Sequence, residues 1–440
     1  MKTIKQISKI FLAILILTSF VNDCFADERK ETFEKTYKLK STGDFDFSCY
    51  DSDLKINTWN KDEVKLTGEI VIQGGKTEDQ DKLIEVFANP EVSESSNSLK
   101  IETDMAKSTI IIGPIKKITL VNGKTIRVDK YKANYTLWIP ESVALKIKSK
   151  YNTIDIASLT GELNFDLYEV DLTLASFKKG VFKMKYSTAE IGTGETARFD
   201  VYECELEVKD IKTFSTNSKY SKFKVGNSEM VAVGSYNDKF NFSNLSKGLT
   251  GVAKYSNFIL NSDIAFLKMD VYESDITVKN IQRLVYSSKY SSLTSLNINT
   301  AKCGILYQTK ISSGDVGSFS CAESKYDKIE FKSIGESVSF DLAYELKLKI
   351  GEAKSSLKNF SGEFKYGYVI MPLDKTLEFS LKYHASYGKV NFPKDKLRVK
   401  EMNIESSSKH SFEGSTSDNP TCTINFKSYE TDFTFEKNDN

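Results

Sequence analysis

A tyrosine recurs every 16 to 19 residues through the middle of this 440-residue chain, and one further tyrosine follows after a longer step. Short runs in which apolar and polar residues alternate flank each of these tyrosines, as is typical of strands with one buried face. Each unit therefore predicts about two short strands and two bends. The tyrosines in this register are Tyr151, Tyr168, Tyr186, Tyr202, Tyr220, Tyr236, Tyr255, Tyr272, Tyr290, Tyr307, Tyr326, Tyr344 and Tyr366.

The units alternate between two classes. In one class a lysine precedes the tyrosine and a small polar residue usually follows it, and in the other an aliphatic residue precedes the tyrosine and an acidic residue often follows it. In the second class the alternation of inward and outward residues changes phase next to the tyrosine. Each tyrosine is therefore predicted to mark a corner of the coil. The lysines are Lys150, Lys185, Lys219, Lys254, Lys289, Lys325 and Lys365, and the glutamates are Glu169, Glu203, Glu273 and Glu345.

Repeats of this length predict an all-β, parallel β-solenoid with capped ends, because stacking buries a continuous core that no single unit could bury. No proline occurs between Pro140 and Pro372, so every backbone N–H in that stretch is available to a ladder. The alternation of classes would suit a 35-residue coil, whereas two strands per tyrosine suit a coil of 17–18 residues. We favour the shorter coil.

Residues 1–26 are predicted to be a signal peptide, since lysines precede an apolar stretch from Ile10 to Val21 and a small residue stands before a cut at Asp27. The expected location is therefore outside the cytoplasm, in the periplasm or on the outer cell surface. A rival interpretation keeps Cys24 as the acylated anchor of a lipoprotein, although two polar residues precede it. No later segment approaches the length of a membrane span.

The mature chain is expected to contain three parts. Residues 27–148 form an N-terminal β region with one short capping helix, in which Thr77 and Gln80 have the spacing of a capping box. Residues 149–371 form the tyrosine-repeat solenoid. Residues 372–440 form a C-terminal β cap whose strands include 423–426 and 432–435.

Composition argues against several functions. Lys plus Arg is 61 and Asp plus Glu is 60, so no net charge favours nucleic acid, and only five of the basic residues are arginines. No motif predicts a catalytic, cofactor or metal site. Only His384 and His410 could support histidine chemistry, and with Tyr383, Tyr387 and Lys409 they are the sole residues of catalytic interest. Cys303 and Cys321, one coil apart, predict stacked buried thiols, with a disulfide as the alternative.

The two charged sets each allow two interpretations. The repeating glutamates could resemble glycosidase carboxylates, but a catalytic pair needs unlike surroundings, so a solvated acidic column is favoured. The lysines could form a ligand-facing ladder for acidic glycans, but the favoured interpretation is that they protect the strand edges and pair with neighbouring acids.

The sequence resembles a bacterial β-strand-repeat family of exported proteins of unknown function labelled "putative adhesin". The residues that carry the likeness are 54–64, the short helix after them, 135–140 and the tyrosine-centred units. Members usually carry Tyr-Gly at the corners, where this chain mostly has Tyr-Ser and Tyr-Glu. The resemblance implies a right-handed β-solenoid and no particular ligand.

We therefore expect an exported, non-enzymatic solenoid that acts as a structural or adhesin-like surface or envelope protein, with a protein or a glycan as partner. A polysaccharide-active β-helix enzyme is the first alternative, and it would need a groove with clustered acids and a basic residue at one level of the stack. The other is an envelope sensor or assembly partner that binds through its caps.

Overall fold

The computed structural model describes residues 28–406 and 408–436, so the predicted signal peptide and Cys24 lie outside the described residues. The chain divides between Asp155 and Ile156 into two compact units. The predicted division at residues 148 and 371 stays a prediction.

The N-terminal unit contains strands β1 to β11, and its sheet mixes antiparallel and parallel strand pairs. Strand β4 pairs antiparallel with both β1 and β10, and β10 pairs in parallel with β3. A separate antiparallel sheet has the order β7-β8-β9. The strands are β1 (Glu28–Lys38), β2 (Asp44–Tyr50), β3 (Ser52–Trp59), β4 (Glu63–Gln73), β5 (Glu91–Glu94), β6 (Ser98–Glu102), β7 (Ala106–Ile112), β8 (Ile115–Leu120), β9 (Thr125–Val128), β10 (Lys130–Pro140) and β11 (Ala144–Ile156).

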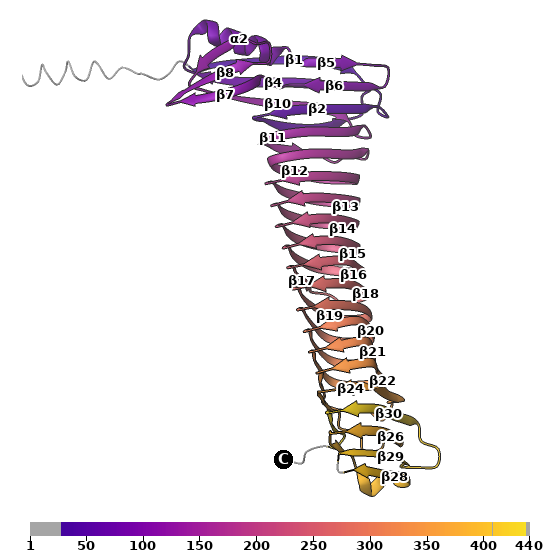
Figure 1. Cartoon of the computed structure of the whole chain (residues 1–440). Helices are drawn as coiled ribbons and strands as arrows, with labels where there is room; N and C mark the ends of the chain where they lie inside the picture. The colour runs from indigo at the N-terminus through magenta and orange to yellow at the C-terminus, as the bar shows by residue number, and fades with distance from the viewer. Residues whose placement is uncertain (1–27, 407, 437–440) are drawn as a thin grey trace, which may run out of the picture. The chain divides into compact units, whose positions relative to one another are not determined.

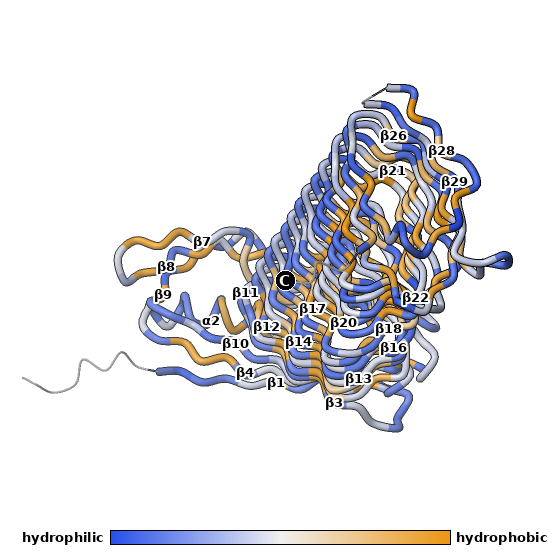
Figure 2. The backbone as a smooth tube through the Cα atoms, turned by 90° about the horizontal axis from the view of Figure 1, so that it is seen from below, coloured by the Kyte–Doolittle hydropathy of each residue, from blue (hydrophilic) through white to orange (hydrophobic). Residues whose placement is uncertain are grey.

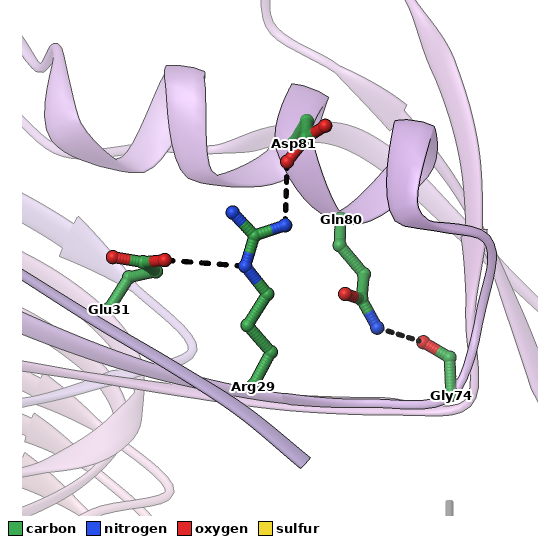
Figure 3. Close-up of polar contacts among 5 residues, drawn as sticks. All are labelled: Arg29, Glu31, Gly74, Gln80 and Asp81. Atoms are coloured by element: carbon green, nitrogen blue, oxygen red, sulfur yellow. Dashed lines mark hydrogen bonds and ion pairs between the residues drawn. The ribbon is translucent and has the colours of Figure 1, made fainter. Parts of the chain in front are cut away.

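The predicted helix is present as α2 (Thr77–Ala88), and its Leu83 and Phe87 are buried. The predicted capping box is wrong, because the N-cap is Lys76 and makes no side-chain cap bond. Gln80 instead points back, and its Nε2 donates to the carbonyl of Gly74 at 3.1 Å (Figure 3).

A charged contact also fastens α2 to the sheet of its own unit. The Arg29 guanidinium of β1 donates to the carboxylate of Asp81 in α2 at 2.6 Å and to Glu31 at 3.3 Å (Figure 3). The ring of Phe87 lies edge-on to Phe33 of β1, with ring centroids 5.0 Å apart. The helix thus covers the strands of its own unit.

The second unit is a stack of parallel coils (Figure 1). Thr188 pairs with Glu205, and Glu205 with Lys222, a step of 17 residues per coil. This confirms the predicted β-solenoid and the shorter coil, and the 35-residue alternative is wrong. Its repeat strands are β12 (Glu162–Lys185), β13 (Thr188–Tyr202), β14 (Glu205–Lys219), β15 (Lys222–Tyr236), β16 (Lys239–Lys254), β17 (Asn257–Leu260), β18 (Ile264–Tyr272), β19 (Asp275–Lys289), β20 (Ser292–Tyr307), β21 (Lys310–Lys325), β22 (Lys328–Tyr344), β23 (Lys347–Ile350), β24 (Asn359–Lys365) and β25 (Tyr368–Ile370).

Side chains of alternate residues along each strand point inward and build the solenoid core, so hydrophobic and hydrophilic columns run along the stack side by side (Figure 2). The rings of Phe223, Phe240 and Phe258 stack on one another in successive coils, with centroids 4.6 and 4.8 Å apart. Val225 and Leu260 in this core are 0% and 2% exposed.

The cysteines belong to this apolar interior. Cys303 and Cys321 are register partners in neighbouring coils, and both are buried free thiols. Burial raises the pKa of Cys321 to about 12. The prediction of stacked buried thiols is confirmed, and the disulfide alternative is wrong.

The C-terminal end departs from sequence order. Strand β30 (Cys422–Tyr429) lies between β24 and β26 (Phe379–Ser386) and is parallel to both. The last coil of the sequence is therefore inserted between two earlier coils, as Figure 1 shows. The remaining elements are β27 (Val390–Asn391), the short helix η1 (Lys394–Lys396), β28 (Arg398–Ser406), β29 (Lys409–Ser415) and β31 (Asp432–Thr434).

The segments 423–426 and 432–435 were predicted to close this end, and they lie inside it instead. The outer strands here are β29, antiparallel to β26, and β28, which pairs only with β29 among the described strands.

Candidate binding surface

One corner of the solenoid is built from residues in the left-handed region. Tyr186 and Tyr220 of the Lys-Tyr-Ser class have φ of 54° and 56°, whereas Glu203 and Glu273, each one residue after a tyrosine, have φ of 49° and 43°. The predicted corners are therefore present. Since coils stack in fixed register, the left-handed position alternates along the stack between tyrosine and the residue after tyrosine.

This alternation places the tyrosines in two neighbouring columns. The ring of each tyrosine contacts the ring of the tyrosine in the next coil, which belongs to the other column. Between consecutive coils the ring centroids are 5.2–5.7 Å apart, and the rings are inclined by 61–80°. Such edge-to-face contacts are favoured by the ring quadrupole. Within the described residues fourteen tyrosines form one series, which we call the tyrosine edge: Tyr168, Tyr186, Tyr202, Tyr220, Tyr236, Tyr255, Tyr272, Tyr290, Tyr307, Tyr326, Tyr344, Tyr366, Tyr429 and Tyr387.

Within the tyrosine edge the left-handed tyrosines are exposed, and most of the tyrosines between them are half-buried. The left-handed members from Tyr186 to Tyr366 are 41–44% exposed, and Tyr387 is 58% exposed. Tyr151, the first tyrosine of the predicted register, belongs to the N-terminal unit and has φ of 60°.

Sequence reasoning missed the last two members, Tyr387 and Tyr429, because their order in the stack is reversed relative to the chain. The signal was nevertheless present, since Tyr387-Gly388 and Tyr429-Glu430 have the corner pattern.

The predicted lysine ladder is interrupted by tyrosines. Lys185 pairs in register with Tyr202, which pairs with Lys219, so consecutive lysines are two coils apart, about 9.6 Å at the spacing of neighbouring strands. Lys325 and Lys365 form ion pairs with Glu323 and Glu363 at 2.5 and 2.7 Å. In the described part of the chain Lys185, Lys219, Lys254 and Lys289 are exposed and form no ion pair.

The glutamates lie on the other side of the same edge. Hydrogen bonding between Tyr202 and the Glu203 carboxylate, with some burial, raises the pKa of the tyrosine to about 12. The same contact with Glu273 raises the pKa of Tyr272. The edge thus presents phenol hydroxyls and ammonium groups in a repeat of two coils, while the corner position after the tyrosine alternates between Glu203, Glu273 or Glu345 and the uncharged Asn237 or Gln308.

A buried column of hydroxyls supports the corner from inside. Ser256 Oγ accepts from the backbone N–H of Asp238 at 3.2 Å and donates to the carbonyl of Lys254 at 2.8 Å. Ser274 repeats the arrangement one coil further, accepting from the N–H of Ser256 at 3.0 Å. The serine of the Lys-Tyr-Ser motif therefore satisfies backbone groups at the turn, where a buried unpaired N–H would be costly.

Two aspartates stand in this hydroxyl column. The Asp327 carboxylate accepts from Ser324 Oγ at 2.6 Å and from the N–H of Thr309 at 2.7 Å. Burial nevertheless raises its pKa to about 6, and burial also raises the pKa of Asp238. Both are 1% exposed and serve the turn, so they are not available to a ligand.

A groove of about 680 Å³ follows the opposite bend of the coils. Asn280 Nδ2 donates to Asp263 at 2.8 Å, and Asn297 Nδ2 donates to Asn280 at 2.9 Å. At the far end Lys354 is 3.3 Å from Asp315. The groove lining is mixed polar and apolar, and most of its polar side chains are bonded to one another along the stack.

The acids of this groove do not have the separation of a glycosidase pair. Asp263 and Asp315 are three coils apart in register, about 14 Å at the strand spacing. Glycosidase carboxyl groups are about 5–9.5 Å apart. Asp315 also has a lowered pKa, caused mainly by its hydrogen bond from Ser333, so it is poorly suited to donate a proton.

The two histidines do not form a common site. His410 lines an apolar hollow of about 470 Å³ at the C-terminal end, and its ring lies 5.6 Å from that of Tyr383. His384 follows Tyr383 in β26, so it points to the opposite face, and it is exposed. Among the described residues no group of His, Cys, Asp or Glu could hold a metal ion, and no helix has the length and apolarity of a membrane span.

Comparisons with known proteins add little to this geometry. No family model matches the chain, and no curated protein matches it. One solved structure, a "putative cell adhesion protein" from Clostridium sporogenes, is aligned over 93% of this chain and 100% of its own, with 8% sequence identity and a TM-score of 0.17. A similarity this low carries no argument about function, so the case for a binding surface rests on the tyrosine edge.

Proposed function

We propose that this chain is an exported, non-enzymatic solenoid whose tyrosine edge binds a long repetitive polymer at the cell envelope, with a glycan favoured over a protein. The observation that carries this proposal is the continuous series of edge-to-face tyrosine rings, in which the left-handed tyrosine of every second coil is exposed. A surface that repeats every two coils offers the same contact many times, so weak contacts add up along one chain of ligand.

The chemistry of the edge suits an acidic polysaccharide. Exposed aromatic rings can cover the apolar C–H faces of sugar rings, which removes apolar surface from water. Lys219, Lys254 and Lys289 stand beside the rings without an acidic partner in the described chain, so they are free to attract carboxylate or sulfate groups.

Binding should be measured with mature protein, residues 27–440, on a panel of neutral and acidic polysaccharides. The triple variant Lys219→Gln, Lys254→Gln, Lys289→Gln should weaken binding to acidic glycans at least tenfold. A control with the same change of charge, Lys209→Gln, Lys268→Gln, Lys302→Gln, should leave binding unchanged. Equal loss in both variants would mean that net charge, and not this edge, determines binding.

Absence of catalysis is part of the proposal. The groove acids are about three coils apart, and the histidines lie on opposite faces, so neither arrangement supports acid–base catalysis. Mature protein incubated with polysaccharides and ester substrates should show no turnover above a heat-treated control. Turnover that His384→Ala or His410→Ala abolishes would establish an enzyme.

Export is also proposed, from the signal sequence alone. Cell fractionation should find a chain that begins near Asp27 outside the cytoplasm, and palmitate should not label it. A labelled protein would make Cys24 a lipid anchor.

A further inference from the structure

The β7–β8 hairpin of the N-terminal unit exposes an uninterrupted apolar tip. Ile110, Ile111 and Ile112 are 56%, 70% and 62% exposed, and Ile115 beyond the turn is 40% exposed. Figure 2 shows the hydrophobic colouring through β7 and into β8. Since neighbouring side chains in a strand point to opposite faces, three exposed isoleucines in a row leave both faces of the tip uncovered.

The same segment carries positive charge and no negative charge. Residues 105–128 contain Lys107, Lys116, Lys117, Lys124 and Arg127 and no Asp or Glu, in a chain whose acids and bases otherwise nearly balance. This is a local charge asymmetry that the overall composition conceals.

The register sorts apolar and basic residues by distance from the tip. Ile112 pairs with Ile115, and Ile110 pairs with Lys117, which pairs in turn with Arg127. These five residues therefore share one face, with isoleucines at the turn and cations set back from it. On the other face, the end of the hairpin away from the turn is covered by the protein, because Ile118, Leu120 and Ile126 are fully buried or nearly so.

We propose that this hairpin is a docking site for the surface of an anionic lipid bilayer. An apolar tip that is bare on both faces suits the boundary of headgroups and acyl chains, which surrounds an inserted residue on all sides. A protein groove would need to enclose both faces. The cations behind the tip would then lie at the level of the lipid phosphates, where negative surface potential attracts them.

Mature full-length protein should be tested by flotation with vesicles of phosphatidylcholine alone and with vesicles that contain phosphatidylglycerol. We expect binding to the anionic vesicles, weakened at least fivefold by raising the salt concentration from 0.1 to 0.5 M, because salt screens the cations. The variant Ile110→Ser, Ile112→Ser should reduce binding at least tenfold, and Lys117→Gln, Arg127→Gln should reduce it on anionic vesicles only.

The matched control removes exposed apolar residues elsewhere. Met402 and Ile404 of β28 are 59% and 63% exposed, and Met402→Ser, Ile404→Ser should bind vesicles as the parent protein does. A tryptophan at position 111 (Ile111→Trp) should shift its fluorescence to shorter wavelength with anionic vesicles, whereas Met402→Trp should not.

Two results would overturn the proposal. One is failure of the parent protein to float with either kind of vesicle. The other is a dimer in sedimentation equilibrium that the isoleucine variant abolishes, since a second copy of the chain would then cover the hairpin.

Discussion

The ring of Tyr186 lies edge-on against the ring of Tyr202 in the next coil, with centroids 5.5 Å apart and an inclination of 78°, although the two residues hold different backbone positions. Tyr186 is itself the left-handed residue, whereas Tyr202 precedes the left-handed Glu203. If every tyrosine held one position, successive rings would be expected to stack in parallel at the coil spacing, as the rings of Phe223 and Phe240 do in the core, whereas two positions allow an edge-to-face contact. The alternation of the two repeat classes in the sequence therefore determines the edge-to-face packing of the tyrosine rings.

Neighbouring tyrosines of this edge should be energetically coupled. Tyr255 and Tyr272 have ring centroids 5.5 Å apart, so a double-mutant cycle with alanine at both positions should give a coupling of about 0.5–1.5 kcal/mol in the free energy of unfolding. Urea unfolding followed by circular dichroism would measure it. The pair Tyr255 and Tyr290, two coils apart, should couple by less than about 0.5 kcal/mol, and equal coupling in both pairs would contradict the ring ladder.

The phase of the strands can be tested by placing a charge inside and outside the coil. Val225 is fully buried, so Val225→Asp should lower the free energy of unfolding by about 3 kcal/mol or more, since the new carboxylate has no partner. Lys239→Asp is the control, because residue 239 is exposed and stands in register beside Lys222. It should change stability by no more than about 0.5 kcal/mol. Comparable losses at both sites would refute the assigned phase.

The pattern of the sequence predicted most of the solenoid for a simple physical reason. Alternation of apolar and polar residues determines which side chains point inward, and repetition at 16–19 residues requires that coils stack. Coil length remained ambiguous because the alternation of Lys-Tyr and Tyr-Glu units suggested a double repeat. Only the strand register shows that each unit of either class forms one coil. The tyrosine of one class lies one residue away, at the corner, from the position of the tyrosine in the other class.

Other features depend on contacts that no local pattern records. Gln80 has the spacing of a capping residue, yet it is drawn to the carbonyl of Gly74 in a loop before the helix. The identical Lys-Tyr motifs allowed a lysine ladder as one interpretation, but the tyrosines of the alternate coils lie between the lysines. The serine after Tyr255 was part of a visible motif, and its role as acceptor for a backbone N–H required the neighbouring coil.

Asp327 should make the stability of the solenoid depend on pH. Its pKa is raised from 3.8 to about 6 by burial, so between these values the folded chain binds more protons than the unfolded chain. The contribution of this residue to stability therefore falls as pH rises from about 4 to 6 and stays low above that. Asp327→Asn should be more stable than the parent by about 1–3 kcal/mol at pH 7.5 and nearly equal to it at pH 4.

This comparison needs urea unfolding of both proteins at several pH values. The asparagine keeps an oxygen for the N–H of Thr309 and can donate to Ser324, so the turn should remain intact. The exposed Asp341→Asn is the matched control and should show no such difference. A parent and Asp327→Asn whose stabilities differ equally at every pH would show that Asp327 does not titrate in this range.

Cysteine cross-linking can test the inserted coil. Ser361 and Asn425 are register partners, so Ser361→Cys with Asn425→Cys should form a disulfide under mild oxidation, within the usual Cα separation of about 4.4–6.8 Å. Ser361→Cys with Lys382→Cys should not, because Lys382 lies beyond Asn425 in the stack. Mass spectrometry of the linked peptides would identify the bond. Preferred linkage between positions 361 and 382 would restore stacking in sequence order.

The position of β30 has a consequence for how the chain is made. Cys422–Tyr429 is synthesised after β26, β28 and β29, yet it forms an interior layer of the stack and not an outer one. A nascent chain that had folded progressively as far as β29 would have to leave a gap one coil wide, or open one, before Cys422–Tyr429 could enter. Folding of these coils must therefore wait until Cys422–Tyr429 has been synthesised, and a chain that stops before residue 422 would lack a middle coil and not a terminal one.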